Sequence, residues 1–251
     1  MGLHDEDGIT VRGLKEVTDS EVVFAESYTS ALSKGAIDRL SKIAGKPIET
    51  LTRLQVEDGS RILEEARNRK VALLVPGDPM TATTHVDLRI RAIKDGIETA
   101  IVHGSSVLTA VPGVLGLQHY KFGRTTTLPF TQEGFAPTSP YDVVAENLRR
   151  GLHTLVLLDI DSENSRFMTA NQGLDVLLDM ERRTGKGVIS EDMLVCAVAR
   201  AGSPDYKAAA GKLRELKEME FGPPLHTLVV PGKLHFMEEE ALSLLKPAQR
   251  A

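Results

Sequence analysis

The chain has 251 residues, of which 41% are hydrophobic and 26% charged, and its formal net charge is −5. This composition is typical of a globular protein with one large or two modest domains, and the negative charge gives no general attraction to nucleic acid or anionic membranes. The single cysteine, Cys196, excludes an intrachain disulfide, and no apolar run reaches the roughly 18 residues of a membrane helix, so we expect a cytoplasmic protein.

Helical and strand patterns alternate in the first half of the chain. Five consecutive apolar residues at 71–75, bounded by turn-forming residues, indicate a central strand buried on both faces of a parallel sheet. The spacing of Ile37, Leu40 and Ile43 is typical of a helix. The patterns predict helices over 10–17, 35–44, 56–69 and 81–94, and strands over 21–26, 71–75 and 99–103.

The turn after the strand at 71–75 has the sequence Pro76-Gly77-Asp78-Pro79. Ligands of open α/β sheets bind at the carboxyl ends of strands, where loops converge. Gly77 would let the backbone approach such a ligand, and Asp78 would be held as a hydrogen-bond acceptor. The same four residues also suit an ordinary turn in which Asp78 bonds the backbone, so the residues alone leave both interpretations open.

The second half of the chain is more mixed. Ser139-Pro140 predicts a helix start with an N-cap serine, and Thr169 predicts the N-cap of a second helix. Apolar runs indicate buried strands, one of which contains Cys196 as a small buried hydrophobe. The predicted strands cover 124–130, 153–160, 194–199 and 227–230, and the predicted helices cover 139–150, 169–183, 204–219 and 237–245.

A Gly/Ser cluster at 104–106, followed by Pro112-Gly113, is the clearest change of composition in the chain. We therefore predict an N-terminal α/β domain at 1–106 and a C-terminal α/β domain at 107–251. Strands and helices occur on both sides of this boundary, so the fold class is α/β.

Motifs of the common catalytic chemistries are absent from the sequence. The seven histidines include no His-Glu-x-x-His and no other pair at metal-ligand spacing beyond chance, so we expect no metal. The Gly-x-Ser-x-Gly nucleophile turn, the phosphate loop and the Gly-x-Gly-x-x-Gly dinucleotide motif are also missing. The common covalent and phosphoryl chemistries therefore have no visible machinery in this sequence.

Seven blocks of sequence, spread over nearly the whole chain, point to a known family. They are Val75-Pro-Gly-Asp-Pro-Met-Thr-Ala-Thr-Thr-His85, Phe24-Ala-Glu-Ser-Tyr-Thr-Ser30, Tyr120-Lys-Phe-Gly123, Gly151-Leu-His-Thr154 with Leu158-Asp-Ile160, Met168-Thr-Ala-Asn171, Ala199-Arg-Ala-Gly202 and Val230-Pro-Gly-Lys-Leu-His235. In content, order and spacing these blocks resemble those of diphthine synthases, a branch of the tetrapyrrole methylase superfamily.

The resemblance implies the two-domain tetrapyrrole methylase-like fold, that of class III methyltransferases, with the cofactor in the cleft between the domains. In that fold a first strand ends in a glycine-rich turn, which the residues Met1 to Glu6 resemble. From the resemblance we expect the first β-strand itself to be missing from this sequence. We expect that the gene model starts too late, because the loss of a central strand would leave a neighbouring backbone unpaired.

The resemblance also implies which residues bind S-adenosyl-L-methionine, matched by position in this chain. From the residues alone, Leu158 and Val107 would be core residues, and His226 would be a histidine at a strand start. Thr81 stands where an aliphatic residue is equally expected, so we expect a backbone or packing contact from it. The implied cofactor-binding residues are Leu3, Asp78, Thr81, Ser106, Val107, Leu158, Ala201 and His226.

By resemblance, the acceptor is the amino group of the 2-(3-amino-3-carboxypropyl) arm on a histidine of translation elongation factor 2. Its repeated N-methylation would give diphthine in diphthamide biosynthesis. The amine must lose a proton before it attacks, and although His85 and Asp78 are conceivable helpers, the catalytic base stays unassigned. The resemblance further implies a homodimer, with elongation factor 2 as partner and without nucleic acid or membrane.

Two alternatives stay open. Another superfamily member would methylate a precorrin or a ribosomal RNA ribose, and would need a pocket for a polyanionic macrocycle or a basic surface. The Tyr-Thr-Ser, Met-Thr-Ala-Asn and Pro-Gly-Lys-Leu-His blocks point away from both. A catalytically incomplete binding protein is the second alternative, because a chain without the first strand could dock on the elongation factor without binding the cofactor. Affinity for S-adenosylmethionine or its homocysteine product separates this protein from an enzyme.

Overall fold

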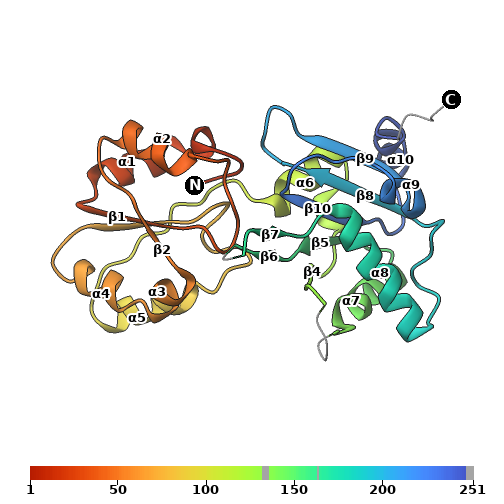
Figure 1. Cartoon of the computed structure of the whole chain (residues 1–251), viewed down its shortest axis with the longest axis horizontal. Coiled ribbons are helices and arrows are strands. Elements are labelled where there is room, and N and C mark those ends of the chain that lie inside the picture. The colour runs from red at the N-terminus through yellow and green to blue at the C-terminus, as the bar shows by residue number, and fades with distance from the viewer. Residues whose placement is uncertain (132–135, 163, 247–251) are drawn as a thin grey trace. The chain divides into compact units, whose positions relative to one another are not determined.

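The computed structural model describes residues 1–131, 136–162 and 164–246. The chain divides into two compact units, the first formed by Met1–Val107 with Ser162–Asn164, and the second by 108–161 with the residues from Ser165 onward (Figure 1). The domain limits of 1–106 and 107–251 stay a prediction. Among the described residues, none of the helices combines the length and the apolarity that crossing a membrane requires.

The first unit is built on a three-stranded parallel sheet of order β2-β1-β3. Its elements are η1 (Glu6–Gly8), α1 (Val11–Asp19), β1 (Val22–Glu26), α2 (Ala36–Ala44), β2 (Glu49–Leu51), α3 (Arg53–Asp58), α4 (Ser60–Ala66), β3 (Val71–Leu74) and α5 (Val86–Lys94). Successive side chains of β1 point to opposite faces, so Val23 and Ala25 pack with α1 and α2, and Phe24 packs with α3 and α4. Figure 1 shows these two helical layers on either side of the sheet.

The second unit contains a five-stranded mixed sheet of order β4-β5-β10-β8-β9, in which β4 and β5 are parallel and the other pairs antiparallel. Its strands are β4 (Thr126–Leu128), β5 (Thr154–Leu158), β8 (Leu194–Ala199), β9 (Lys207–Lys212) and β10 (His226–Val230). A separate two-stranded sheet is formed by β6 (Ile160–Asp161) and β7 (Arg166–Phe167). Its helices are α6 (Val107–Leu115), η2 (His119–Lys121), α7 (Ser139–Arg149), α8 (Ala170–Thr184), α9 (Leu213–Lys217) and α10 (Phe236–Ser243). Leu174 and Leu177 of α8 pack with Leu228 of β10 in its core.

One of the two predicted N-caps is confirmed and the other lies one residue away. Thr169 caps α8 by accepting a hydrogen bond from the Gln172 N–H, and the Gln172 side chain accepts one from the Thr169 N–H. The predicted N-cap Ser139 is instead the first residue of α7, because the chain enters the helix one residue earlier, at Thr138. The predicted strands at 21–26, 194–199 and 227–230 are confirmed to within one residue.

The prediction of one helix over 204–219 is wrong. Residues 207–212 form β9, and only Leu213–Lys217 is helical. The run Lys-Ala-Ala-Ala-Gly-Lys contains good helix formers, but all six residues pair with β8, from Lys207 opposite Ala199 to Lys212 opposite Leu194. Tertiary pairing outweighs local propensity here, and small side chains suit the buried positions of this strand.

Three further predictions in the first unit are wrong. Residues 99–103 belong to no strand, because their backbone forms no ladder with any described strand. In the described sheet β3 lies at an edge and three of its four residues are half-buried, so it is not a central strand buried on both faces. The helix predicted over 56–69 is divided by Gly59, whose φ of +68° ends α3, and α5 begins at Val86 because a turn occupies the preceding residues.

Candidate functional site

The Asp78 carboxylate joins the turn after β3 to residues 103–104. Oδ1 accepts hydrogen bonds from the Met80 N–H (2.9 Å) and the Thr81 hydroxyl (3.2 Å), and Oδ2 accepts them from His103 Nδ1 (2.8 Å) and the Gly104 N–H (3.2 Å). Burial acts to raise the pKa of this carboxyl, but the four hydrogen bonds outweigh it and hold the pKa below its usual value. Asp78 is therefore ionised and accepts hydrogen bonds. Its bond from the Met80 N–H also forms the turn of the kind in which an aspartate bonds the backbone.

Three segments of backbone meet at this turn because glycines allow a close approach. Gly77 donates its N–H to the Gly2 carbonyl oxygen (2.7 Å) and accepts the Gly2 N–H in return (3.1 Å). Its φ of +73° lies in the left-handed region. A Cβ on Gly104 would lie 2.6 Å from the Gly77 carbonyl oxygen. Residues 1–3, 76–81 and 103–107 are thereby held next to one another.

The five implied cofactor residues of the first unit lie in these three segments. Leu3 follows Gly2, Thr81 bonds Asp78, and Ser106 and Val107 follow the Gly104 contact. All except the buried Asp78 are half-buried. The hydrogen bond from the Thr81 hydroxyl to Asp78 is a role that the sequence did not indicate. Together the segments offer backbone groups, small side chains and one carboxylate.

His226 is buried at the start of β10, and both of its ring nitrogens have partners. Nδ1 lies 3.0 Å from the backbone nitrogen of Ala170, and Nε2 lies 3.0 Å from the Pro223 carbonyl oxygen. An N–H only donates and a carbonyl only accepts, so the ring is neutral with its hydrogen on Nε2. Burial lowers its pKa, which favours the same form. Because both ring nitrogens are occupied, any contact between His226 and a cofactor would involve its backbone or the face of its ring.

Arg200 fixes the turn that carries Ala201. Its N–H donates to the Leu225 carbonyl (2.7 Å), and its Nη1 donates to the carbonyls of Phe221 (2.8 Å) and Pro223 (2.9 Å). One side chain thus joins the Ala201 turn to the segment that leads into β10. Arg200 lies in one of the sequence blocks, but no pattern in the sequence indicated this role.

Leu158 is the implied cofactor residue that is most clearly part of the core. It is 8% exposed, and a Cβ on Gly173 would lie 2.7 Å from its Cδ2 atom. Leu157 pairs with Thr227 across the antiparallel strands β5 and β10, so Leu158 lies beside His226. The implied residues of the second unit are thus gathered at one end of its sheet.

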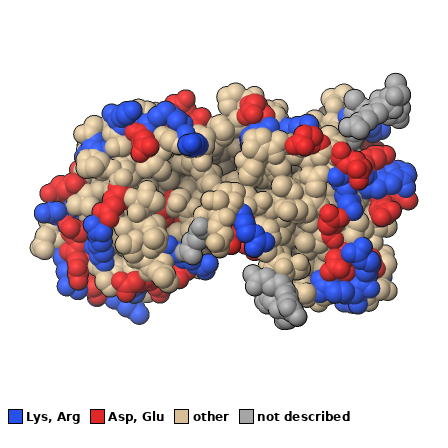
Figure 2. Space-filling model, in the orientation of Figure 1, with Lys and Arg blue, Asp and Glu red and all other residues tan. Residues whose placement is uncertain are grey.

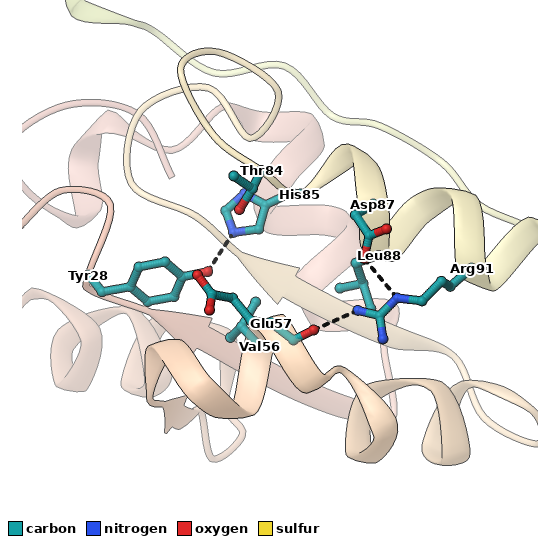
Figure 3. A pocket seen from close by; sticks show the side chains of 8 residues that line it. All are labelled: Tyr28, Val56, Glu57, Thr84, His85, Asp87, Leu88 and Arg91. Atoms are coloured by element: carbon teal, nitrogen blue, oxygen red, sulfur yellow. Dashed lines mark hydrogen bonds and ion pairs between the residues drawn. The ribbon is translucent and has the colours of Figure 1, made fainter. Parts of the chain in front are cut away.

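A pocket of about 220 Å³ opens in the first unit beside the turn that contains Asp78 and Pro79 (Figure 3). His85, which is 7% exposed, points into it and lies between two partners. Its Nδ1 is 3.2 Å from the Pro79 carbonyl oxygen and its Nε2 is 3.3 Å from the Tyr28 hydroxyl. Burial, followed by the charges of nearby carboxylates, raises the pKa of Tyr28 to about 12. The lining residues are Tyr28, Val56, Glu57, Thr84, His85, Asp87, Leu88 and Arg91.

Arg91 of α5 lies at the wall of this pocket. It is half-buried at this pocket, and its two terminal nitrogens donate to the carbonyl oxygens of Glu57 and Asp58 at the end of α3. Its Nε lies 2.9 Å from Asp87 Oδ2, in an ion pair without hydrogen-bond geometry. Arg91 therefore fastens α5 to α3.

Glu238 is a buried carboxylate that sequence reasoning missed, although three of the blocks meet at it. Oε1 accepts from the Gln118 N–H (2.9 Å) and His153 Nε2 (3.0 Å), and Oε2 accepts from the His235 N–H (2.8 Å) and Lys121 Nζ. Burial acts to raise the pKa of Glu238, but the Lys121 ammonium and the other donors lower it to about 2. The Tyr-Lys-Phe-Gly, Gly-Leu-His-Thr and Pro-Gly-Lys-Leu-His blocks are thereby tied together.

Two expectations concern metals and surface charge. Among the described residues, no three His, Cys, Asp or Glu side chains are grouped so that they could hold a metal ion. On the face that Figure 2 shows, Lys and Arg are interspersed with Asp and Glu. This face offers no basic surface of the kind that an RNA substrate requires.

The chain is similar to members of one enzyme family. The family model for tetrapyrrole (corrin/porphyrin) methylases matches residues 1–217. The diphthine synthase of Methanocaldococcus jannaschii is 48% identical over 98% of this chain and 96% of the relative, and that of Methanothermobacter thermautotrophicus is 44% identical over 100% and 95%. A crystal structure of diphthine synthase superposes with a TM-score of 0.88 at 36% identity, covering 98% of this chain and 93% of that one.

Proposed function

The chain belongs to the tetrapyrrole methylase family and, within it, to the diphthine synthases, and on this premise we propose that it methylates elongation factor 2 with S-adenosylmethionine as donor. It is a methyltransferase of diphthamide biosynthesis. The proposed acceptor is the amino group of the 2-(3-amino-3-carboxypropyl) arm on a histidine of that factor, and trimethylation gives diphthine. The observation that carries the proposal is the 48% identity to a diphthine synthase over 98% of the chain.

The residues around Asp78 fit a nucleoside-type methyl donor. Gly77 and Gly104 let three backbone segments pack around Asp78, and a carboxylate accepts hydrogen bonds from ribose hydroxyls. The four hydrogen bonds of Asp78 fill its acceptor capacity, so a ligand hydroxyl would replace one of the present donors. His103 is the candidate for this exchange because its side chain is 73% exposed. When bound, S-adenosylmethionine supplies an electrophilic methyl group on a sulfonium.

We propose that the implied residues of both units bind this cofactor. In the first unit, Leu3 and Val107 supply apolar surface and Asp78 supplies the acceptor. In the second, the bonds of Arg200 hold Ala201 in place, and the buried His226 holds the start of α8. The chain's own contribution is to bind, orient and desolvate the reactants, which is what methyl transfer from a sulfonium requires.

Calorimetric titration with S-adenosylhomocysteine tests cofactor binding directly. We expect saturable binding at one site per chain, and no binding of ATP, which shares the adenosine but not the amino-acid arm. Absence of S-adenosylhomocysteine binding by the folded protein would favour the incomplete binding protein over the enzyme.

Methyl transfer is tested with elongation factor 2 that carries the aminocarboxypropyl arm on its histidine. Mass spectrometry should show mass increments of whole methyl groups on this arm, and none on a control factor with an unmodified histidine. Methylation of the control factor would contradict the proposed acceptor.

We also propose a homodimer that acts in the cytoplasm, where elongation factor 2 works. Light scattering of the purified protein measures the oligomeric state.

A further inference from the structure

The pocket in the first unit holds an unassigned pair of side chains that are placed for proton transfer. Tyr28, in the loop after β1, directs its hydroxyl at the Nε2 atom of His85, at 3.3 Å (Figure 3). On its other side, the His85 ring reaches the carbonyl oxygen of Pro79, the residue after Asp78, at 3.2 Å. The pair thus connects the pocket to the turn at which we propose that the methyl donor binds.

The Pro79 carbonyl fixes which nitrogen of His85 can accept a proton. A carbonyl oxygen only accepts hydrogen bonds, so Nδ1 carries the ring hydrogen and Nε2 keeps a lone pair. This lone pair faces the Tyr28 hydroxyl. A base held by an orienting group on one nitrogen and a proton donor on the other is the arrangement used in general base catalysis, and such bonds are often long in the absence of ligands.

Tyr28 is suited to relay a proton and not to act as the base itself. Its pKa of about 12 keeps the hydroxyl protonated at neutral pH. The hydroxyl can therefore give its proton to His85 only while it takes another from a ligand. A phenol that is half-buried at the wall of a pocket meets this condition.

The charges around the pocket suit a cationic amine. Glu57 and Asp87 supply two carboxylates, and each is paired with an arginine, Glu57 with Arg53 (2.6 Å) and Asp87 with Arg91 (2.9 Å). The charged and titratable groups that face Tyr28 and His85 are Glu26 at the end of β1, Arg53 and Glu57 on α3, and Asp87 and Arg91 on α5. These three carboxylates outnumber the two guanidiniums.

We propose that this pocket binds the amine to be methylated and that Tyr28 passes the proton of this amine to His85. The proposal rests on the proposed function and supplies the base that it lacks. The ammonium nitrogen gives a proton to the Tyr28 oxygen while the Tyr28 hydroxyl proton moves to His85 Nε2. The tyrosine stays neutral, the positive charge passes to the imidazole, and the nitrogen retains the lone pair that methyl transfer requires. Between rounds the imidazolium returns its proton to solvent.

Two variants remove the proton path with little change of shape. Tyr28→Phe lacks only the relay hydroxyl, and His85→Gln offers Tyr28 a hydrogen-bond acceptor that cannot be protonated. We expect each to lower the rate of single-turnover methyl transfer about 100-fold at pH 7, the low end of the contribution of a positioned base. The loss should shrink as the pH rises toward 9.5, because more of the amine is then already neutral. Tyr120→Phe, at a tyrosine that is 79% exposed, is the matched control and should match the wild type.

Titration with S-adenosylhomocysteine separates this role from a structural one. We expect both variants to bind it within twofold of the wild-type affinity and to melt within a few degrees of the wild type. Wild-type rates at pH 7, or a loss of the same size at every pH, would overturn the proposal while leaving the proposed function intact. A wild-type protein that methylates no modified elongation factor 2 would instead overturn the proposed function.

The tautomer of His85 provides a test that needs no catalysis. Nitrogen NMR of the folded protein, with the His85 signals assigned by their absence in His85→Gln, should show the ring hydrogen on Nδ1. A hydrogen on Nε2 would leave no acceptor for Tyr28 and would overturn the proposal.

Discussion

Asp78 in the first unit and Glu238 in the second are both carboxylates that accept four hydrogen bonds, yet their surroundings differ. Asp78 is 8% exposed, and one of its donors, His103, has a side chain that is 73% exposed. Glu238 is fully buried, and its donors include the buried His153 and the Lys121 ammonium. Asp78 can exchange a donor for a ligand, whereas Glu238 cannot do so without leaving a charge unpaired. Four hydrogen bonds thus hold a carboxylate at the proposed binding turn in the first unit, and four hold one at a structural junction in the second.

The largest expected effect is that of Glu238→Ala on stability. Removal of this carboxylate takes its ionic partner from the Lys121 ammonium and the acceptor from two backbone N–H groups, and breaking such a buried pair costs about 3–5 kcal/mol. Urea unfolding should show this loss. The exposed neighbour Glu239 is the matched control, and Glu239→Ala should change the unfolding free energy by less than about 0.5 kcal/mol. Equal losses in the two variants would show that Glu238 is not a structural junction. Its contrast with Asp78 would then disappear.

Asp78→Asn should act mainly on cofactor binding. The amide of asparagine presents donors to N–H groups that now bond a carboxylate, and hydrogen bonds to a charged group contribute about 1.5–3 kcal/mol. We expect affinity for S-adenosylhomocysteine to fall about 10- to 100-fold while the protein stays folded. Asp19→Asn, at an exposed aspartate of α1, should bind as the wild type does. Unchanged affinity of Asp78→Asn would make Asp78 a turn former only.

The two carboxylates also predict how stability depends on pH. The folded pKa of Glu238 is about 2, below its ordinary value of 4.5, so its contribution is complete above about pH 4.5 and is lost as the pH falls toward 2. The pKa of Glu181 is also lowered to about 2, mainly by the Tyr141 hydroxyl, so the stability that Glu181 contributes is likewise lost as the pH falls. In Glu238→Gln the unfolding free energy should therefore fall less steeply over this range than in the wild type. Parallel curves would show that Glu238 does not contribute as an ion.

The smallest expected effect is that of Thr81→Val. It removes one neutral donor, at 3.2 Å from Asp78 Oδ1, while three donors remain. We expect affinity for S-adenosylhomocysteine to fall about threefold, which is under 1 kcal/mol and within the usual range for one hydrogen bond. A loss as large as that of Asp78→Asn would show that Thr81 contacts the cofactor itself.

Features that depend on neighbouring residues could be predicted from the sequence. The N-cap at Thr169 and the turn at Asp78 arise from contacts within three residues, and both occur where the sequence indicated. The strand at 194–199 is apolar along its whole length and is confirmed. The alternating helices and strands likewise indicated the α/β class.

Features that depend on distant partners could not be predicted. His103 lies 25 residues from Asp78, and His153 lies 85 residues from Glu238, so nothing local marks either pair. The alanines at 208–210 favour a helix by themselves and become a strand only beside β8. The sequence blocks located much of the candidate site, but which blocks meet, and at which buried carboxylate, is decided by the tertiary fold.

The alanine-rich β9 also bears on how the molecule avoids edge-to-edge aggregation of its sheet. As the last strand of its sheet, it has an outer edge whose backbone groups could pair with a strand of another molecule. The Leu245 carbonyl accepts the Ala210 N–H (2.9 Å), and Lys207 and Lys212 place a charge at each end of the strand. Leu245, two residues after α10, thus covers part of an edge that the small, uncharged side chains of β9 would otherwise leave open to aggregation.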